Sequence, residues 1–351
     1  MNITVASRSQ PAPDQARASR RENLVTVILG LWLILGFFID GYAHGNLRGS
    51  LENFFTPWHA ILYSGFLATS GWMFWMIARR LNRWQGLKAI PVGYELGLVG
   101  VFVFGLGGVA DLIWHMVFGI EIGLDALRSP SHIMLFIGAI LLMTAPLRAS
   151  WQDPNSKSNP SLLEFLPVIF VVFATFAFTS LMNLHVWGLV SAPDSIPELQ
   201  RLSTDNPAVS YAQHSFVDAS ILFTNAAMMF SILLLLQRWQ TPFGTFGIIL
   251  GLSTLVLVVI VDTNMIPRVY MAALAGTMID ALIQILRPNP TRVLELRVFA
   301  AFAPLLIWGT HFLAVQFTGG LGISPELWTG ILTMNVLSGL ALSLLVVPTR
   351  T

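Results

Sequence analysis

The sequence contains no cysteine and few charged residues. The absence of cysteine excludes disulfides, thiolate metal ligands, iron–sulfur clusters and cysteine nucleophiles together. Any bound metal must therefore be held by nitrogen and oxygen, with methionine sulfur as the remaining alternative. Charged residues make up 11% of the 351, and the formal net charge is +1. A chain with so little net charge has no basic surface of the kind that binds nucleic acid, so we expect no nucleic-acid partner.

Apolar residues dominate the composition. They make up 55% of the chain, and the mean hydropathy is +0.70. Such values are typical of a polytopic membrane protein whose main partner is the lipid bilayer. Because a span needs about 20 apolar residues, the sequence predicts an all-α membrane helix bundle. Its ten expected spans are 24–43, 57–79, 92–116, 131–149, 162–184, 212–236, 243–262, 268–286, 297–317 and 326–347.

The distribution of basic residues predicts the topology. Residues 1–22 are polar and basic, which indicates a disordered cytoplasmic tail leading into a retained first helix without a clear cleavage signal. Basic residues also gather in the loops after the even-numbered spans, so the positive-inside rule places both termini in the cytoplasm. Residues 23–351 then form a single transmembrane domain, expected in a bacterial inner membrane. Its five outward-pointing hairpins lie near 24–79, 92–149, 162–236, 243–286 and 297–347.

Two hairpins carry the same order of aspartate and histidine. The first reads D-x3-H-x14-H and the second D-x3-H-x16-H, and TPWHAILYSG aligns with SPSHIMLFIG without a gap. The spacing of i, i+4 puts the first two side chains on one helix face. A short loop then brings the second histidine, at the start of the next span, close to them. The predicted metal ligands are Asp40, His44 and His59 in the first hairpin and Asp111, His115 and His132 in the second.

The other histidines follow this pattern only in part. The third hairpin has His185 and His214, but its acid, Asp218, follows the second histidine. The fifth has His311, and Leu327 of SPEL stands where a second histidine would be. We treat all four ionisable residues as additional candidate ligands, although a hydrogen-bonded interfacial role is the ordinary one for His311. In the predicted topology every histidine lies toward the outer membrane face, so the site is expected to face the extracytoplasmic side.

Histidine and aspartate in this arrangement favour a transition metal. Imidazole is the commonest neutral metal ligand, and a carboxylate one helical turn away can bind the ion or orient the ring. Burying charge near lipid is costly unless the charge is paired or bound to a metal. The donor set suits copper, zinc or non-haem iron, and ligand type alone does not choose among them. Tyr63, four residues after His59, fits a donor to the ligands, although an interfacial tyrosine is the commoner explanation.

The repeated Asp-x3-His unit, followed by a histidine on the next helix, resembles a known copper-binding arrangement. It is similar to the copper-binding helices of the C subunit of copper membrane monooxygenases, the particulate methane and ammonia monooxygenase family. The resemblance covers only the two hairpin ends, and the intervals between ligands differ from those of the family. It implies one copper site on each hairpin, formed by the six ligands named above. It also implies an oxidoreductase that acts on a small or lipid-soluble substrate.

Other functions remain open on the residues alone. A zinc-dependent intramembrane hydrolase needs only a histidine-bound ion that activates water, although the HExxH motif of zincins is absent. A transporter would use the outer polar layer as a vestibule, but its inner half offers few ionisable residues besides Glu95 and Asp280. An accessory subunit would bind pigment or haem through pairs of histidines, or dock partner subunits of a membrane complex.

Overall fold

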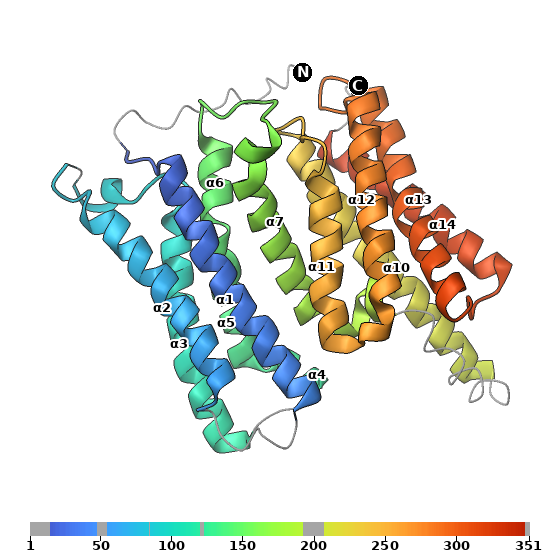
Figure 1. The fold of residues 1–351 in the computed structure, drawn as a ribbon, viewed down its shortest axis with the longest axis horizontal. Helices are drawn as coiled ribbons and strands as arrows, with labels where there is room; N and C mark the ends of the chain where they lie inside the picture. The colour runs from blue at the N-terminus through green and yellow to red at the C-terminus, as the bar shows by residue number, and fades with distance from the viewer. Residues whose placement is uncertain (1–14, 48–54, 84, 120–122, 192–206, 348–351) are drawn as a thin grey trace. The chain divides into compact units, whose positions relative to one another are not determined.

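The computed structural model describes residues 15–47, 55–83, 85–119, 123–191 and 207–347 (Figure 1). These residues form helices, turns and connections, and no β-strand occurs among them, which confirms the expected all-α class. The chain divides into two compact units. The first is Met1–Ser156 with Phe170–Thr175, and the second is Lys157–Ile169 with Phe176–Thr351. Each unit is described separately below.

Within the described part of the chain, nine helices are long and apolar enough to cross a membrane. The expected span 243–262 corresponds to α11 (Thr245–Val261), which is apolar but only 17 residues long. At 1.5 Å per residue such a helix extends about 25 Å, less than the roughly 30 Å of a bilayer core. The described helices are therefore consistent with the expected helical membrane bundle: nine are long enough to cross a membrane, and a shorter helix stands at the tenth expected span.

The first unit contains two helical hairpins (Figure 1). Its helices are α1 (Arg20–Asn46), α2 (Pro57–Ala78), η2 (Gly86–Ala89), α3 (Glu95–Phe118), α4 (Leu124–Arg128), α5 (Pro130–Met143) and α6 (Ala145–Gln152). Helix α1 packs against α2, and α3 packs against α5. The second helix of each hairpin starts in the same way, with a hydroxyl at the N-cap and a proline after it. These caps satisfy backbone N–H groups that a helix start leaves unpaired.

Glycine lets the paired helices of this unit approach closely. A Cβ added at Gly138 on α5 would lie 2.5 Å from Phe104 N, and one added at Gly100 on α3 would lie 2.6 Å from Gly138 O. Between α1 and α2, a Cβ at Gly65 would lie 2.7 Å from Leu33 Cα. Small residues at such contacts allow backbone-to-backbone packing in a membrane. The glycines therefore set how each helix of a hairpin lies against its partner.

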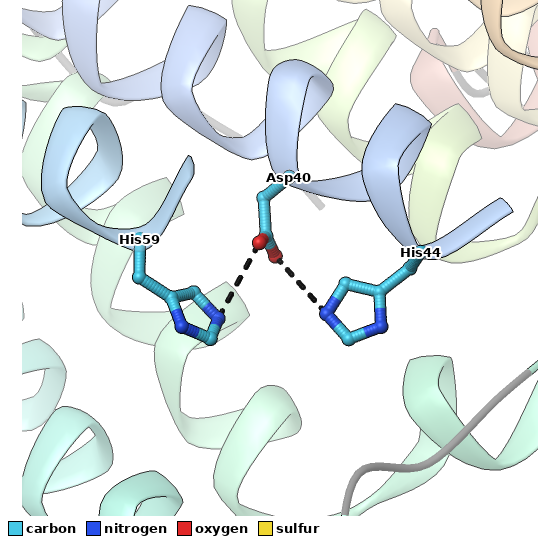
Figure 2. A group of neighbouring side chains, drawn as sticks. All are labelled: Asp40, His44 and His59. Atoms are coloured by element: carbon cyan, nitrogen blue, oxygen red, sulfur yellow. Dashed lines mark ion pairs between the residues drawn. The ribbon is translucent and has the colours of Figure 1, made fainter. Parts of the chain in front are cut away.

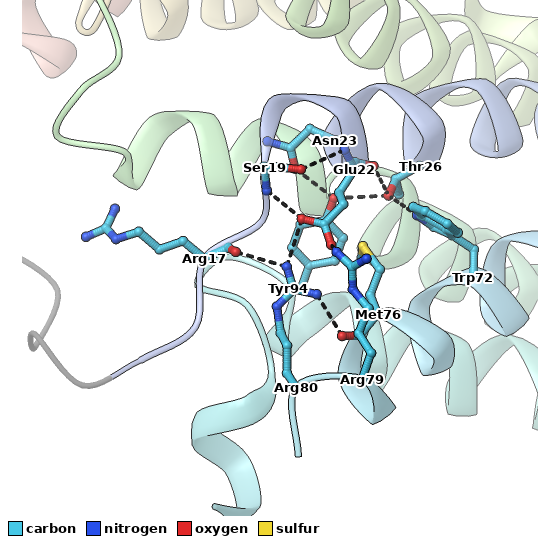
Figure 3. A network of polar contacts seen from close by, with 10 residues as sticks. All are labelled: Arg17, Ser19, Glu22, Asn23, Thr26, Trp72, Met76, Arg79, Arg80 and Tyr94. Atoms are coloured by element: carbon cyan, nitrogen blue, oxygen red, sulfur yellow. Dashed lines mark hydrogen bonds and ion pairs between the residues drawn. The ribbon is translucent and has the colours of Figure 1, made fainter. Parts of the chain in front are cut away.

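A polar network joins the N-terminal end of α1 to the C-terminal end of α2 (Figure 3). Glu22 is 4% exposed and forms ion pairs with both Arg79 and Arg80. The Arg80 Nη2 atom lies 2.8 Å from Glu22 Oε2. Ser19 and Glu22 also form a capping box, in which each side chain accepts the other residue's backbone N–H. This network fixes the end of the first hairpin that lies farthest from its histidines.

Tyr94 and the segment before α1 extend this network. The Tyr94 hydroxyl donates to Asn23 Oδ1 at 2.8 Å, and burial raises the pKa of Tyr94, so the phenol remains a donor. Residue Ala16 is buried and pairs through its backbone with Lys88 and Val92. The disordered tail expected over 1–22 is therefore ordered from residue 15 onward, because these backbone groups are paired. Residues 1–14 of the expected tail lie outside the described part.

We expect Glu22→Ala to destabilise the protein by about 2 kcal/mol, because Arg80 would stay largely buried without its carboxylate. The thermal unfolding midpoint of detergent-solubilised protein measures this. Glu295→Ala is the matched control, since Glu295 pairs with Arg292 at an exposed position and its removal should change the midpoint little. Equal midpoints for the two variants would contradict the role assigned to Glu22.

The second unit contains α7 apart from Phe170–Thr175, and the packed helices that follow it in the chain. Its elements are α7 (Leu162–Met182), η3 (Leu184–Val186), α8 (Gly188–Ser191), α10 (Pro207–Leu236), α11, η4 (Thr263–Met265), α12 (Ile266–Leu286), α13 (Val293–Thr318) and α14 (Pro325–Val346). Helix α11 packs on α12, α12 on α13, α13 on α14 and α14 on α10. The packing of α11 on α12 places the start of α11 beside Asp280, near the end of α12.

Two acidic residues cap helix starts. In the second unit, Asp280 on α12 is fully buried, and its carboxylate accepts the backbone N–H groups of Gly244, Phe246 and Gly247, each at 3.1 Å. A carboxylate at this place satisfies orphan N–H groups and suits the positive end of the helix dipole. In the first unit, Glu95 accepts the Gly93 N–H at 2.8 Å at the start of α3. Both residues therefore have a structural role.

Candidate metal centre

Asp40, His44 and His59 form a group that we call the first cluster (Figure 2). The carboxylate of Asp40 lies between the two imidazoles. His59 Nε2 is 3.3 Å from Asp40 Oδ1, and His44 Nε2 is 3.8 Å from Asp40 Oδ2. One ligand atom from each residue lies within 4.8 Å of the other two. The structure thus brings together the three ligands expected in the first hairpin.

Asp111, His115 and His132 form the second cluster, with nearly the same geometry. His132 Nε2 is 3.3 Å from Asp111 Oδ1, and His115 Nε2 is 3.6 Å from the same oxygen. The aspartate is 1% exposed and His115 is buried. In both clusters, the histidine on the second helix of the hairpin lies nearer to the carboxylate than does the histidine four residues after the aspartate.

Local structure explains why these side chains converge. The aspartate and first histidine of each cluster lie one turn apart, with the histidine in the last turn of α1 or α3. A histidine there is also favoured by the negative end of the helix dipole. The second histidine is the third residue of α2 or α5. Its backbone N–H is bound by the N-cap hydroxyl, at 3.2 Å from Thr56 Oγ1 to His59 and 3.4 Å from Ser129 Oγ to His132.

The spacing of the ligand atoms fits a metal ion. Ligands held about 2.0–2.1 Å from a tetrahedral ion lie about 3.3–3.4 Å apart. The four carboxylate-to-imidazole distances run from 3.3 to 3.8 Å, longer than an ordinary hydrogen bond. In the first cluster, Asp40 Oδ1 and His44 Nδ1 are buried, and neither forms a hydrogen bond to the described residues. Each cluster could therefore hold a metal ion, and its donors suit zinc, copper or iron.

The second cluster is held by further hydrogen bonds. Ser131 Oγ donates to its aspartate at 3.0 Å. The Nδ1–H of His115 donates to the carbonyl of Gly119 at 3.2 Å, and Nδ1 of His132 lies 2.6 Å from Ser129 Oγ. Bonds of this kind fix the ring tautomer and turn Nε2 toward a metal. The sequence signals Ser129, as the N-cap in SPSH, but carries no signal for the Gly119 carbonyl.

The two clusters are neighbours in the first unit. The ring centroids of His59 and His115 are 6.2 Å apart. The Tyr63 phenol hydrogen-bonds with Asp111. Gly108 leaves room for this ring, because a Cβ there would lie 2.9 Å from Tyr63 Cε1. Tyr63 is therefore a hydrogen-bond partner of a candidate ligand.

The additional candidate ligands all lie in the second unit. His185 is in η3, His214 and Asp218 are on α10, and His311 is on α13. Among the residues that the structure describes, they form no group like the two clusters. His311 is 3% exposed, and its Nε2 makes no hydrogen bond to that part of the chain. The ring of His311 lines a small cavity together with Arg268, and its expected interfacial role stays a prediction.

No protein-family model, curated protein or solved structure matches the chain. The resemblance to the C subunit of copper membrane monooxygenases thus stays a prediction that rests on ligand spacing. The proposed function therefore rests on the geometry of the two clusters.

Proposed function

We propose that the protein is a metal-dependent integral membrane enzyme, with copper as the favoured metal and oxidoreduction as the favoured reaction. The observation that carries the proposal is the pair of neighbouring clusters, each with two imidazoles and one carboxylate at metal-ligand spacing. Zinc-dependent hydrolysis is the alternative, because zinc accepts the same donors. The bound ion would supply either redox chemistry or a Lewis acid.

The chain's own residues have identifiable roles in this proposal. The carboxylates of Asp40 and Asp111 balance the positive charge of the ions, which would be costly in an apolar setting. The outward hydrogen bonds of the second cluster keep its rings in a metal-binding orientation. The end of α3 beside this cluster exposes Met116, Val117 and Phe118. Such an apolar surface suits a small or lipid-soluble substrate that arrives through the bilayer.

Transport has less support than catalysis. Residues Asp280 and Glu95 would have extended a polar path toward the inner face. Both are engaged with backbone N–H groups at helix starts, so their carboxylates already have partners. The aspartates and histidines of the first unit, in contrast, gather in two compact groups.

Metal analysis of the purified protein tests the proposal. We expect up to two ions per chain, one for each cluster, after reconstitution of the detergent-solubilised protein with Cu²⁺, Zn²⁺ or Fe²⁺. The metal retained against a chelator then separates the copper from the zinc form. Binding well below one equivalent for all three metals would reject a metal-dependent function.

The proposed extracytoplasmic side can be tested by labelling, since the chain has no native cysteine. Leu47, just after the first cluster, and Leu81, beyond the other end of α2, are both exposed. Leu47→Cys should react with a membrane-impermeant thiol reagent in intact cells, whereas Leu81→Cys should react only after permeabilisation. The reverse pattern would place the clusters on the cytoplasmic side.

A further inference from the structure

The two clusters share their ligand geometry but differ in what surrounds it. Around the second cluster, Ser131 donates to the aspartate, and the Nδ1 atoms of both histidines have partners in Gly119 and Ser129. Tyr63 adds a hydrogen bond to the same aspartate. Every ligand of this cluster is thus fixed by at least one bond outside the group.

The first cluster lacks part of this support. The TPWH segment places Trp58 at the position that corresponds to Ser131 in SPSH. The indole N–H of Trp58 is buried and donates no hydrogen bond to the described residues. Within the same residues, His44 Nδ1 and Asp40 Oδ1 are also buried without a hydrogen bond. Asp40 Oδ1 and His44 Nδ1, both on α1, therefore have no hydrogen bond from outside the cluster among the described residues.

The side chains of the aspartate and the first histidine are more exposed in the first cluster than in the second. The side chains of Asp40 and His44 are 13% and 11% exposed, against 2% for both Asp111 and His115. An ion held by three protein ligands keeps an open coordination position. At the first cluster, that position adjoins the more exposed pair of ligands.

We propose that the clusters are unequal: the second binds a resident ion tightly, and the first binds an exchangeable ion with a position open to a small oxygen or nitrogen donor. This inference rests on the proposed function and assigns a different task to each site. Loss of an outer hydrogen-bond partner costs about 10–100-fold in metal affinity. The second cluster should therefore bind metal at least about 10-fold more tightly than the first.

Titration of the metal-free protein with Cu²⁺, followed by electron paramagnetic resonance, tests the order of binding. We expect two steps in wild type, with only the tighter step left in His44→Ala and only the weaker step left in His115→Ala. Azide, used as a small anionic nitrogen donor, should then change the copper spectrum of His115→Ala and leave that of His44→Ala unchanged.

Exchange of the outer partners gives a matched test without removal of a ligand. Ser131→Ala should weaken the tighter step by about 10-fold and leave the weaker step alone. Trp58→Ser, which restores the serine of the second hairpin, should strengthen the weaker step. Ser70→Ala is the control, because Ser70 on α2 is buried, and its hydroxyl has no hydrogen bond among the described residues; it should change neither step.

The outcomes separate this inference from the proposed function. Equal affinities, tighter binding at the first cluster, or an azide effect confined to the second would overturn the inequality while the protein remains a metal-binding one. Failure of wild type to bind Cu²⁺ at either cluster would overturn both. Binding of one ion that His44→Ala and His115→Ala each abolish would show a single shared ion, which also overturns the inference.

Discussion

His44→Ala is expected to lower the bound metal from two ions per chain to one. His44 belongs only to the first cluster, and it is one of three candidate ligands there. Removal of a direct ligand should cost more than the about 10–100-fold loss in affinity that follows loss of an outer partner. The ion of the second cluster should remain, because its ligands lie on α3 and α5. Equilibrium dialysis against saturating Cu²⁺ measures the change in bound metal.

The complementary variant and a control complete this prediction. His132→Ala should also leave one ion, and the double variant should bind none. His214→Ala is the matched control, since His214 is on α10 in the second unit and belongs to neither cluster. Two ions retained in His44→Ala would contradict the assignment of His44. Loss of metal from His214→Ala would place a ligand outside the clusters.

The grouping of the candidate ligands within each hairpin was predictable from the sequence, because short-range geometry decides it. A spacing of four residues places aspartate and histidine on one helix face. A capping hydroxyl followed by proline fixes the start of the next helix, and a short connection brings that start back to the same end. All six ligands expected on this reasoning converge in the structure.

Contacts between hairpins were not predictable in the same way. The approach of His59 to His115 depends on how α2 lies beside α3, which no local spacing determines. Tyr63 reaches Asp111 because residue 108 is a glycine on the facing helix. The third hairpin shows the converse, since residue types alone predicted ligands at His185 and His214. There the acid and second histidine share α10, while the first histidine lies in a separate turn.

Helix length and capping explain the differences in the fold. Hydropathy predicted a tenth span near 243–262, but Asp262 ends α11 at residue 261 by accepting the Asn264 N–H in the next turn. The buried pair of Glu22 with Arg79 and Arg80 joins residues more than fifty positions apart. A hydropathy profile shows Glu22, Arg79 and Arg80 only as charged residues at the ends of spans. It carries no information on which of them pair.

Packing of α3 against α5 links the fold directly to the second cluster, because His132 is on α5 and its two partner ligands are on α3. Gly138 packs directly against the backbone of Phe104 in this contact. Gly138→Val is therefore expected to force the helices apart. The overpacking should cost about 3 kcal/mol, although valine is intrinsically no worse than glycine in a helix.

The displacement should act selectively on metal binding. His132 would move away from Asp111, so the affinity of the second cluster for Cu²⁺ should fall at least about 10-fold, while the first cluster on α1 and α2 keeps its ion. Gly105→Val is the matched control on α3, since a Cβ there would lie 3.8 Å from Phe66 Cζ, an ordinary contact. A similar loss at both clusters in Gly138→Val would indicate general unfolding of the unit. Unchanged binding at the second cluster would show that the glycine contact does not position His132.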